Sequence, residues 1–168
     1  RTAAVSAGLV LLVGVLGLAL NAPVLYPSLG PTAYLLVHDA NHRTASFHNT
    51  VVGHVLALVS GIFAVEVFGY QDAAGIFSPS AHLTMGRVVA AVVALGLTVM
   101  LALWLRASHP PAGSTALVIV LGGFRVTAHA VFAVAAGVVA MALAGELLRR
   151  LKLIGVPPDA SPISPGRG

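Results

Sequence analysis

The sequence has no cysteine and very few charged residues among its 168 positions. Without cysteine there are no disulfide bonds, no thiolate nucleophiles and no Cys-ligated zinc or iron–sulfur sites. Only 8% of the residues are charged, against about 25% in a typical soluble domain, which argues against a water-soluble globular protein. The nine Lys and Arg residues are scattered, and nucleic-acid binding is excluded because it requires cations clustered on one face.

Apolar residues make up 58% of the chain, and the mean hydropathy is +0.96. A membrane-spanning helix needs about 20 mostly apolar residues, and charged residues mark where it ends. The stretches with little or no charge predict four full spans, at residues 3–21, 50–69, 87–105 and 126–148. We therefore expect an all-α integral membrane protein.

Two shorter apolar segments, residues 22–37 and 107–124, are interrupted by proline and glycine. Each predicts a half-helix, because proline ends one helix and starts another. A shift of 83 residues places 30–37 on 113–120, and a shift of 84 places 53–61 on 137–145. The sequence thus predicts two repeats of span, re-entrant half-helix and span, since short half-helices favour re-entry. If the half-helices cross fully, the repeats are inverted instead.

The expected organisation is a first membrane repeat with its connecting loop at residues 1–80, a second repeat at 81–152 and a disordered tail at 153–168. The Lys and Arg count places both termini, together with the connection near residues 69–87, in the cytoplasm. We expect a bacterial plasma membrane as the location. Gly- and Ala-rich helix faces also favour close helix contact, so a homo-oligomer is expected.

Both half-helices begin with glycine and a hydroxyl residue. A helix start exposes N–H groups and carries the equivalent of about +0.5 charge, so it favours an anion. Two starts facing each other predict a site for a small inorganic anion at Gly30, Pro31, Thr32, Gly113, Ser114 and Thr115. The alternative is that these residues only cap the helices and let them pack closely.

Four further residues are candidates for the ion pathway or for tuning its charge. Arg43 and Arg125 each follow a half-helix and would either attract anions or snorkel to lipid headgroups. His54 and His109 titrate near neutral pH and would either respond to the anion or serve as core histidines bonded to backbone carbonyls. No recognisable metal-ligand motif surrounds the seven histidines, so we expect no catalytic residues, no metal and no cofactor.

The string from His109 through Pro110 and Pro111 to Ala116 (HPPAGSTA) resembles the signature of the HPP family of integral membrane proteins. Residues 27–33 (PSLGPTA) are similar to the family's first loop, and Asn49, Gly53 and His54 are similar to its Asn-x-x-x-Gly-His element. The resemblance covers residues 2–150. It adds Pro110 and Pro111 to the anion site and Asn49 to the pathway. This chain departs from the family in having His48 where an Arg is expected before the Asn.

The HPP family is described as four-spanning membrane proteins, and transport, including nitrite transport, is attributed to members from photosynthetic sources. The resemblance therefore implies a membrane transporter or channel for a small inorganic anion, with nitrite as the candidate. Two alternatives stay open: a membrane structural or sensory protein without transport, and a His-rich metal-dependent membrane protein.

Overall fold

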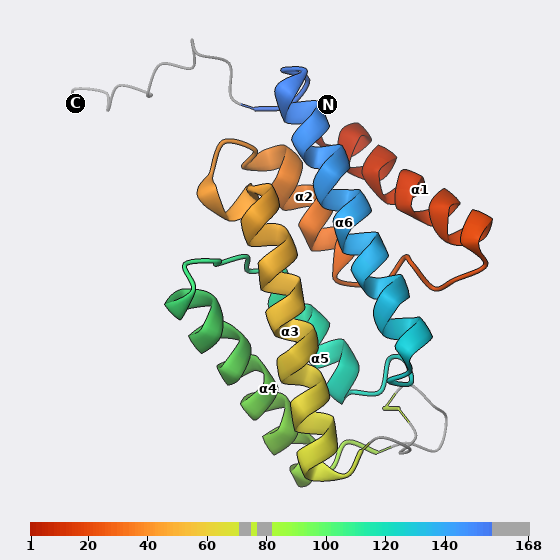
Figure 1. Ribbon diagram of the computed structural model, residues 1–168, viewed down its shortest axis with the longest axis vertical. Helices are drawn as coiled ribbons and strands as arrows, with labels where there is room; N and C mark the ends of the chain where they lie inside the picture. Colours follow the sequence, from red (N-terminus) through yellow and green to blue (C-terminus); the bar gives the residue numbers. More distant parts are fainter. Residues whose placement is uncertain (71–74, 77–81, 156–168) are drawn as a thin grey trace, which may run out of the picture.

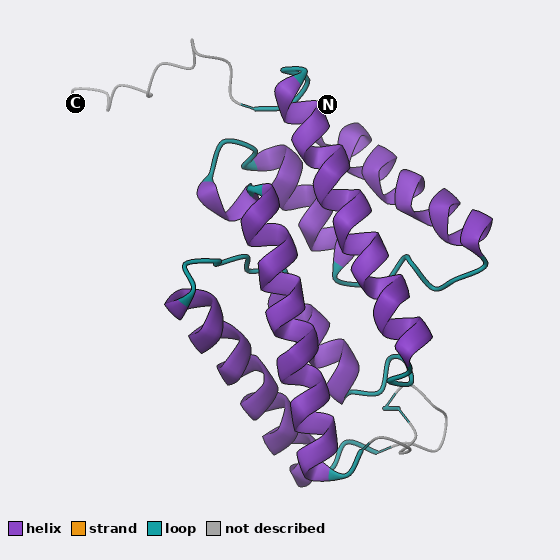
Figure 2. Ribbon diagram, viewed as in Figure 1, coloured by secondary structure: helices purple, strands orange, loops and turns teal. Residues whose placement is uncertain are grey.

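The computed structural model describes residues 1–70, 75–76 and 82–155, and in these the chain is helical without strands (Figure 2). The elements are α1 (Thr2–Leu20), α2 (Leu29–His38), the 3-10 turn η1 (Arg43–Ala45), α3 (Phe47–Phe68), α4 (Met85–Trp104), α5 (Ala112–Val120) and α6 (Ala128–Arg150). Within the described residues, the four helices α1, α3, α4 and α6 are long and apolar enough to cross a membrane. The expectation of four spans and two shorter helices is confirmed, and α2 and α5 are called the half-helices below.

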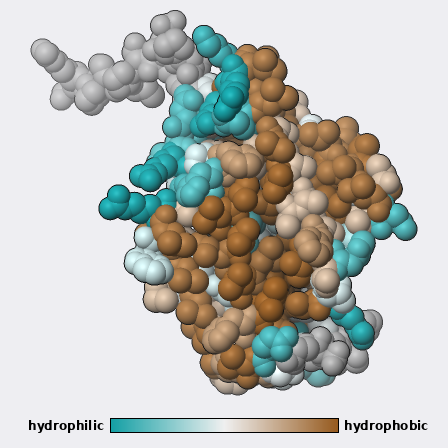
Figure 3. Space-filling model, in the orientation of Figure 1, coloured by the Kyte–Doolittle hydropathy of each residue, from teal (hydrophilic) through white to brown (hydrophobic). Residues whose placement is uncertain are grey.

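The outer faces of the long helices are apolar. Leu18 of α1 is 83% exposed, Trp104 of α4 78% and Phe132 of α6 75%. Figure 3 shows apolar residues covering the middle of this face, with polar residues gathered along its upper left and along its right and lower right. Exposure of such a surface to water costs about 25 cal/mol per Å², whereas lipid tails solvate it. The protein is an integral membrane protein in contact with the bilayer.

Each half-helix packs against two long helices, and one of the two offers it a pair of glycines. The missing side chains let the backbones approach closely, as small residues do between membrane helices. A Cβ on Gly61 would lie only 3.1 Å from the Cβ of Ile119, for example. In each pair, the earlier glycine of the long helix faces the earlier residue of the half-helix. The half-helix α5 therefore runs parallel to α3, and α2 runs parallel to α6. On α3, Gly53 and Gly61 face Ala112 and Ile119 of α5; on α6, Gly137 and Gly145 face Leu29 and Leu36 of α2.

The long helices that precede the half-helices end in the same way. Asn21 after α1 has φ 47° and Arg106 after α4 has φ 52°, and this left-handed conformation stops the helix. Proline then keeps the next residues out of a helix, at Pro23 and Pro27 in one case and at Pro110 in the other. Non-helical segments therefore lead from α1 and α4 to the starts of α2 and α5, inside the bundle.

The directions of the helices correct one expectation. Re-entrant half-helices would make α1 and α3 antiparallel and would place the connection near residues 69–87 beside the chain termini. Figure 1 shows instead that α1 and α3 both run away from the end of the bundle that holds Arg1, so the end of α3 lies opposite Arg1 and Arg150. The reason is reach, because non-helical residues advance the chain about twice as far per residue as an α-helix does. Each half-helix with its non-helical lead thus carries the chain back along the bundle.

The two ends of the membrane region lie together. The guanidinium of Arg1 donates a hydrogen bond of 2.9 Å from Nη2 to the carbonyl oxygen of Leu153. The expected boundary at residue 80 and the expected disordered tail from residue 156 onward lie outside the described residues. The division into residues 1–80, 81–152 and 153–168 therefore stays a prediction.

Candidate functional site

The starts of the two half-helices meet inside the bundle. Ser28, the residue before α2, and Thr115, the fourth residue of α5, lie 2.7 Å apart between Oγ and Oγ1. From this point α2 and α5 run toward opposite ends of the molecule (Figure 1). The positive ends of both helix dipoles therefore point at one central place.

His54 of α3 bridges the two half-helices. Its Nδ1 lies 2.7 Å from Thr115 Oγ1, and its Nε2 lies 3.0 Å from Thr32 Oγ1. His109, which precedes α5, places its Nε2 3.4 Å from the same Thr32 oxygen, and the two imidazole centroids are 5.1 Å apart. We call the following residues the hydroxyl–histidine cluster: Ser28, Thr32, Thr50, His54, His109 and Thr115.

The hydroxyl–histidine cluster is buried. Its side chains are 0% exposed except that of His109, at 4%. An unpaired buried polar group costs about 1–3 kcal/mol, so each hydrogen bond of the cluster matters to the stability of the fold. Polar and ionisable residues inside a membrane protein commonly mark a substrate or ion pathway, which makes this cluster the candidate functional site.

The hydrogen bonds determine which nitrogen of His54 carries the proton. Thr32 Oγ1 donates to the backbone carbonyl of Ser28 at 2.9 Å, since a carbonyl can only accept. The Thr32 oxygen therefore accepts from the Nε2–H of His54, and His54 Nδ1 accepts from the hydroxyl of Thr115. The Thr115 oxygen in turn accepts from the Ser28 hydroxyl. The bonds form a closed ring that begins and ends at Ser28 and holds both half-helices to α3.

His109 is held from the other side by η1 and α3. Its Nδ1–H donates to the carbonyl oxygen of Thr44 at 2.8 Å, and Thr50 Oγ1 lies 3.5 Å from the same nitrogen. Asn49 Nδ2 donates to the carbonyl of Ser108 at 3.0 Å. Asn49 therefore fixes the backbone directly before His109 and acts as a positioning residue.

Tyr26 lies at the edge of the hydroxyl–histidine cluster. Its ring meets that of His54 edge to face, with centroids 6.4 Å apart and planes at 86°. The side chain is 7% exposed, and the hydroxyls of Ser28 and Thr115 are its polar neighbours. Yet the Tyr26 hydroxyl has no hydrogen-bond partner among the residues that the structure describes.

Two cavities approach the cluster from different sides. One of about 410 Å³ is lined by Tyr26 and Pro27 together with residues of α5 and α6. A smaller one of about 90 Å³ lies between α4 and the start of α5 and is lined by His109, Pro110 and Gly113. These two cavities thus reach the edge of the cluster at Tyr26 and the cluster itself at His109.

The sequence model of the family described as HPP, transmembrane region, matches residues 1–155. The chain belongs to the HPP transmembrane family. In this HPP protein the His-Pro-Pro string is the lead into α5, and its histidine is a member of the buried cluster. Comparison with curated proteins and with solved structures gives no match.

The HPP protein brings together four of the residues predicted for the site, namely Thr32, Thr115, His54 and His109. A fifth, Asn49, acts on the cluster indirectly, by binding the backbone carbonyl of Ser108 directly before His109. Thr32 and Thr115 stand at matching positions of the two half-helices, and His54 binds both.

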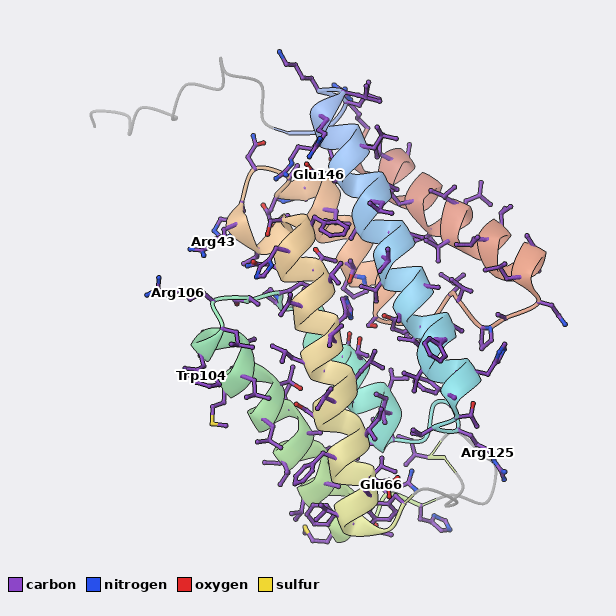
Figure 4. All side chains as sticks on the ribbon, in the orientation of Figure 1. Arg43, Glu66, Trp104, Arg106, Arg125 and Glu146 are labelled. Carbon is purple, nitrogen blue, oxygen red and sulfur yellow. The ribbon has the colours of Figure 1, made fainter. Side chains whose placement is uncertain are left out.

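The other predicted residues lie outside the cluster. Gly30 and Pro31 are exposed on α2, while Pro111 and Ser114 are half-buried and Ser114 Oγ donates to the Pro111 carbonyl at 2.6 Å. Pro110 and Gly113 line the smaller cavity. Figure 4 shows Arg43 and Arg125 on opposite sides of the bundle, and both side chains are exposed.

The backbone N–H groups at the two helix starts are already bonded. The N–H of Gly30 donates to the Pro27 carbonyl at 3.3 Å, and the N–H of Gly113 donates to the Pro110 carbonyl at 3.2 Å. The groups that face the centre are therefore hydroxyls and imidazoles, whereas the expectation was that backbone N–H groups and hydroxyls together would coordinate the anion.

Three residues of the site and its edge were not predicted: Ser28, Thr50 and Tyr26. Thr50 stands four residues before His54 and so shares its helix face, a signal present in the sequence. Tyr26 stands 83 residues before His109, the shift that relates the half-helices. Among the described residues, no group of three or more His, Asp or Glu side chains is placed to hold a metal ion.

Proposed function

We propose that this HPP protein carries a small inorganic anion across the membrane, with the hydroxyl–histidine cluster as its binding site and nitrite as the first candidate. One observation carries the proposal: two helix starts point at a single buried cluster made of hydroxyl and imidazole groups. Helix starts favour negative charge, and hydroxyl groups donate to it. No member of the cluster is a carboxylate, so nothing within it repels an anion.

The Ser28 and Thr115 pair is the place where an anion would enter the cluster. Their hydroxyl oxygens are 2.7 Å apart, and each hydroxyl hydrogen can rotate about its C–O bond. An anion that separates the two oxygens would accept a hydrogen bond from each. Because these residues belong to different half-helices, loading the site would also alter the contact between α2 and α5.

An inverted duplication is part of the same proposal. Thr32 and Thr115 correspond under the shift of 83 residues, as do Leu29 with Ala112 and Leu36 with Ile119. The glycine pairs on α3 and α6 correspond under the shift of 84 and face those residues. The opposite directions of α2 and α5 favour inverted over parallel repeats. Paired broken helices in inverted repeats are typical of secondary transporters, whose site opens to each side in turn.

The proposal also covers the orientation of the protein in the membrane and its oligomeric state. Arg1, Arg149, Arg150 and Lys152 gather at the end of the bundle that holds both ends of the membrane region, which favours a cytoplasmic position for the termini in a bacterial plasma membrane. The exposed apolar face of α1 offers a surface for a homo-oligomer within the bilayer. Native mass spectrometry from detergent would report the number of protomers.

Uptake of nitrite, nitrate, chloride and formate into liposomes that contain the purified protein tests the proposed function. We expect saturable uptake that is selective for one of the four, and a large loss of uptake in Thr115→Val after normalisation to folded protein. Ser60→Ala is the matched control. Ser60 is buried on α3 at 2% exposure, and its hydroxyl has no hydrogen-bond partner among the described residues.

Absence of uptake for all four anions, in protein that retains its helical structure, would contradict the proposal. It would favour a structural or sensory role in which the broken segments only pack the helices. Equal uptake by Thr115→Val and the wild type would contradict the position of the site.

A further inference from the structure

His109 presents a lone pair toward the centre of the hydroxyl–histidine cluster. Its Nδ1 carries the proton that Thr44 accepts through its carbonyl, so the neutral ring has an unprotonated Nε2. That nitrogen lies 3.4 Å from Thr32 Oγ1, whose own hydrogen is directed to the Ser28 carbonyl. Two lone pairs therefore face each other across this gap. A proton bound to Nε2 would be donated to the Thr32 oxygen and would complete the bond.

Among the described residues, the contacts of His109 supply no charged group that could balance an anion. From α2 it meets Thr32, from η1 the Thr44 carbonyl, and from α3 Thr50 and the imidazole of His54. The side facing α4 is a small cavity, and the titratable group beyond His54 is Tyr26.

Lys and Arg are absent from these described contacts, and the arginines predicted for the pathway, Arg43 and Arg125, are exposed. An unbalanced charge in a buried membrane site is costly, so the anion needs a positive partner.

Tyr26 provides the complementary group, a donor without an acceptor. The side chain is 7% exposed, and its hydroxyl is near those of Ser28 and Thr115 but makes no hydrogen bond of normal geometry to a described residue. A buried unpaired hydroxyl is unfavourable, and an anion placed between Ser28 and Thr115 would accept its hydrogen. Tyr26 thus marks where the anion binds, and His109 marks where a proton binds.

Building on the proposed function, we infer that the anion moves together with one proton, with the proton bound at His109 Nε2 and the anion held by the Tyr26 hydroxyl. Proton and anion enter from the same side and leave on the other side. The occupied cluster then has the same net charge as the empty one, which removes the cost of bringing an unbalanced anion into the bilayer. His54 itself stays neutral throughout.

Proteoliposomes loaded with a pH-sensitive dye, at external pH 7.5 with nitrite as the probe, test the coupling. Protein-free liposomes give the passive entry of the neutral acid, which is subtracted. We expect one proton to enter with each nitrite, and an uptake rate that does not change when a potassium gradient with valinomycin sets the membrane potential. Uptake driven by the potential without acidification would overturn the coupling while leaving nitrite transport in place. Absence of nitrite uptake would overturn both.

Two variants test the assigned residues. Asn at position 109 can still donate to the Thr44 carbonyl but has no nitrogen to protonate, so His109→Asn is expected to lose coupled uptake at least tenfold. His129→Asn, at an exposed histidine of α6, is its control and should keep the wild-type rate. Tyr26→Phe retains the ring and loses only the unpaired hydroxyl, so the protein should fold normally while its affinity for nitrite falls roughly 10- to 100-fold. Wild-type coupling in His109→Asn, or wild-type affinity in Tyr26→Phe, would overturn the assignment.

Discussion

Replacing Thr115 by valine tests whether the closed ring of hydrogen bonds holds the half-helices in place. Valine keeps the shape of threonine without its hydroxyl, so the variant leaves His54 Nδ1 without a donor and the Ser28 hydroxyl without its acceptor. Both side chains are 0% exposed, and water cannot replace the lost partner. Each unpaired buried group costs about 1–3 kcal/mol, so we expect the free energy of unfolding to fall by about 2–6 kcal/mol.

Two matched variants separate this effect from the loss of an ordinary hydroxyl. Thr115→Ser keeps the hydroxyl and removes one methyl group, which costs about 0.5–1.5 kcal/mol in a packed interior. Thr98→Val removes a buried hydroxyl on α4 that donates only to the Ala94 carbonyl of its own helix, at 2.8 Å. Its expected cost is about 0.5–1.5 kcal/mol.

Circular dichroism at the helical minimum during heating in detergent is a suitable assay, because the protein has no cysteine for thiol-reactive dyes. In a chain of this size, each kcal/mol lowers Tm by about 2–4 °C. We expect Thr115→Val to melt well below both Thr115→Ser and Thr98→Val. If Thr115→Val melts with Thr98→Val, the ring of hydrogen bonds does not exist as described.

Two further predictions concern packing and support of the site. Gly61→Ala places a methyl group against the backbone and side chains of α5, so the free energy of unfolding should fall by about 1–3 kcal/mol. The control is Gly96→Ala on α4, where the new methyl group meets nothing within 4 Å, and this variant should leave Tm unchanged or raise it. Equal Tm values in the two variants, measured by the same melting assay, would refute the close approach of α3 and α5. Asn49→Ala removes the hydrogen-bond donor of the Ser108 carbonyl. We therefore expect the free energy of unfolding to fall by about 1–3 kcal/mol and anion uptake to become slower. Normal uptake by a destabilised Asn49→Ala protein would show that Asn49 supports only the fold.

The spans could be predicted because the bilayer imposes a local constraint. Charged residues cannot lie in lipid, so the gaps between them locate α1, α3, α4 and α6, and the helix found at Phe47–Phe68 matches the predicted 50–69 within a few residues. The half-helices could also be predicted from local sequence, because proline ends one helix and starts the next. Their directions did not follow, because those depend on how far the non-helical leads reach and on glycines of α3 and α6 that are distant in sequence.

The functional site, too, could be predicted only in part. Thr32 and Thr115 could be predicted from their places at the starts of two matching segments. The role of His54 as the bridge between them could not, because it joins residues that are 83 positions apart. Tyr26 was missed because an aromatic residue beside proline gives no signal of a buried, unpaired hydroxyl. Arg43 was predicted from its charge and its place after a half-helix, and neither shows whether a side chain faces the interior or the surface.

Bromide bound to crystals of the protein would test the central claim most directly, because its anomalous scattering locates an anion without assuming a pathway. The account predicts a bromide peak between the starts of α2 and α5, within hydrogen-bond distance of the hydroxyls of Tyr26, Ser28 and Thr115. Peaks confined to the exposed Arg43 and Arg125, with none between the half-helices, would contradict it.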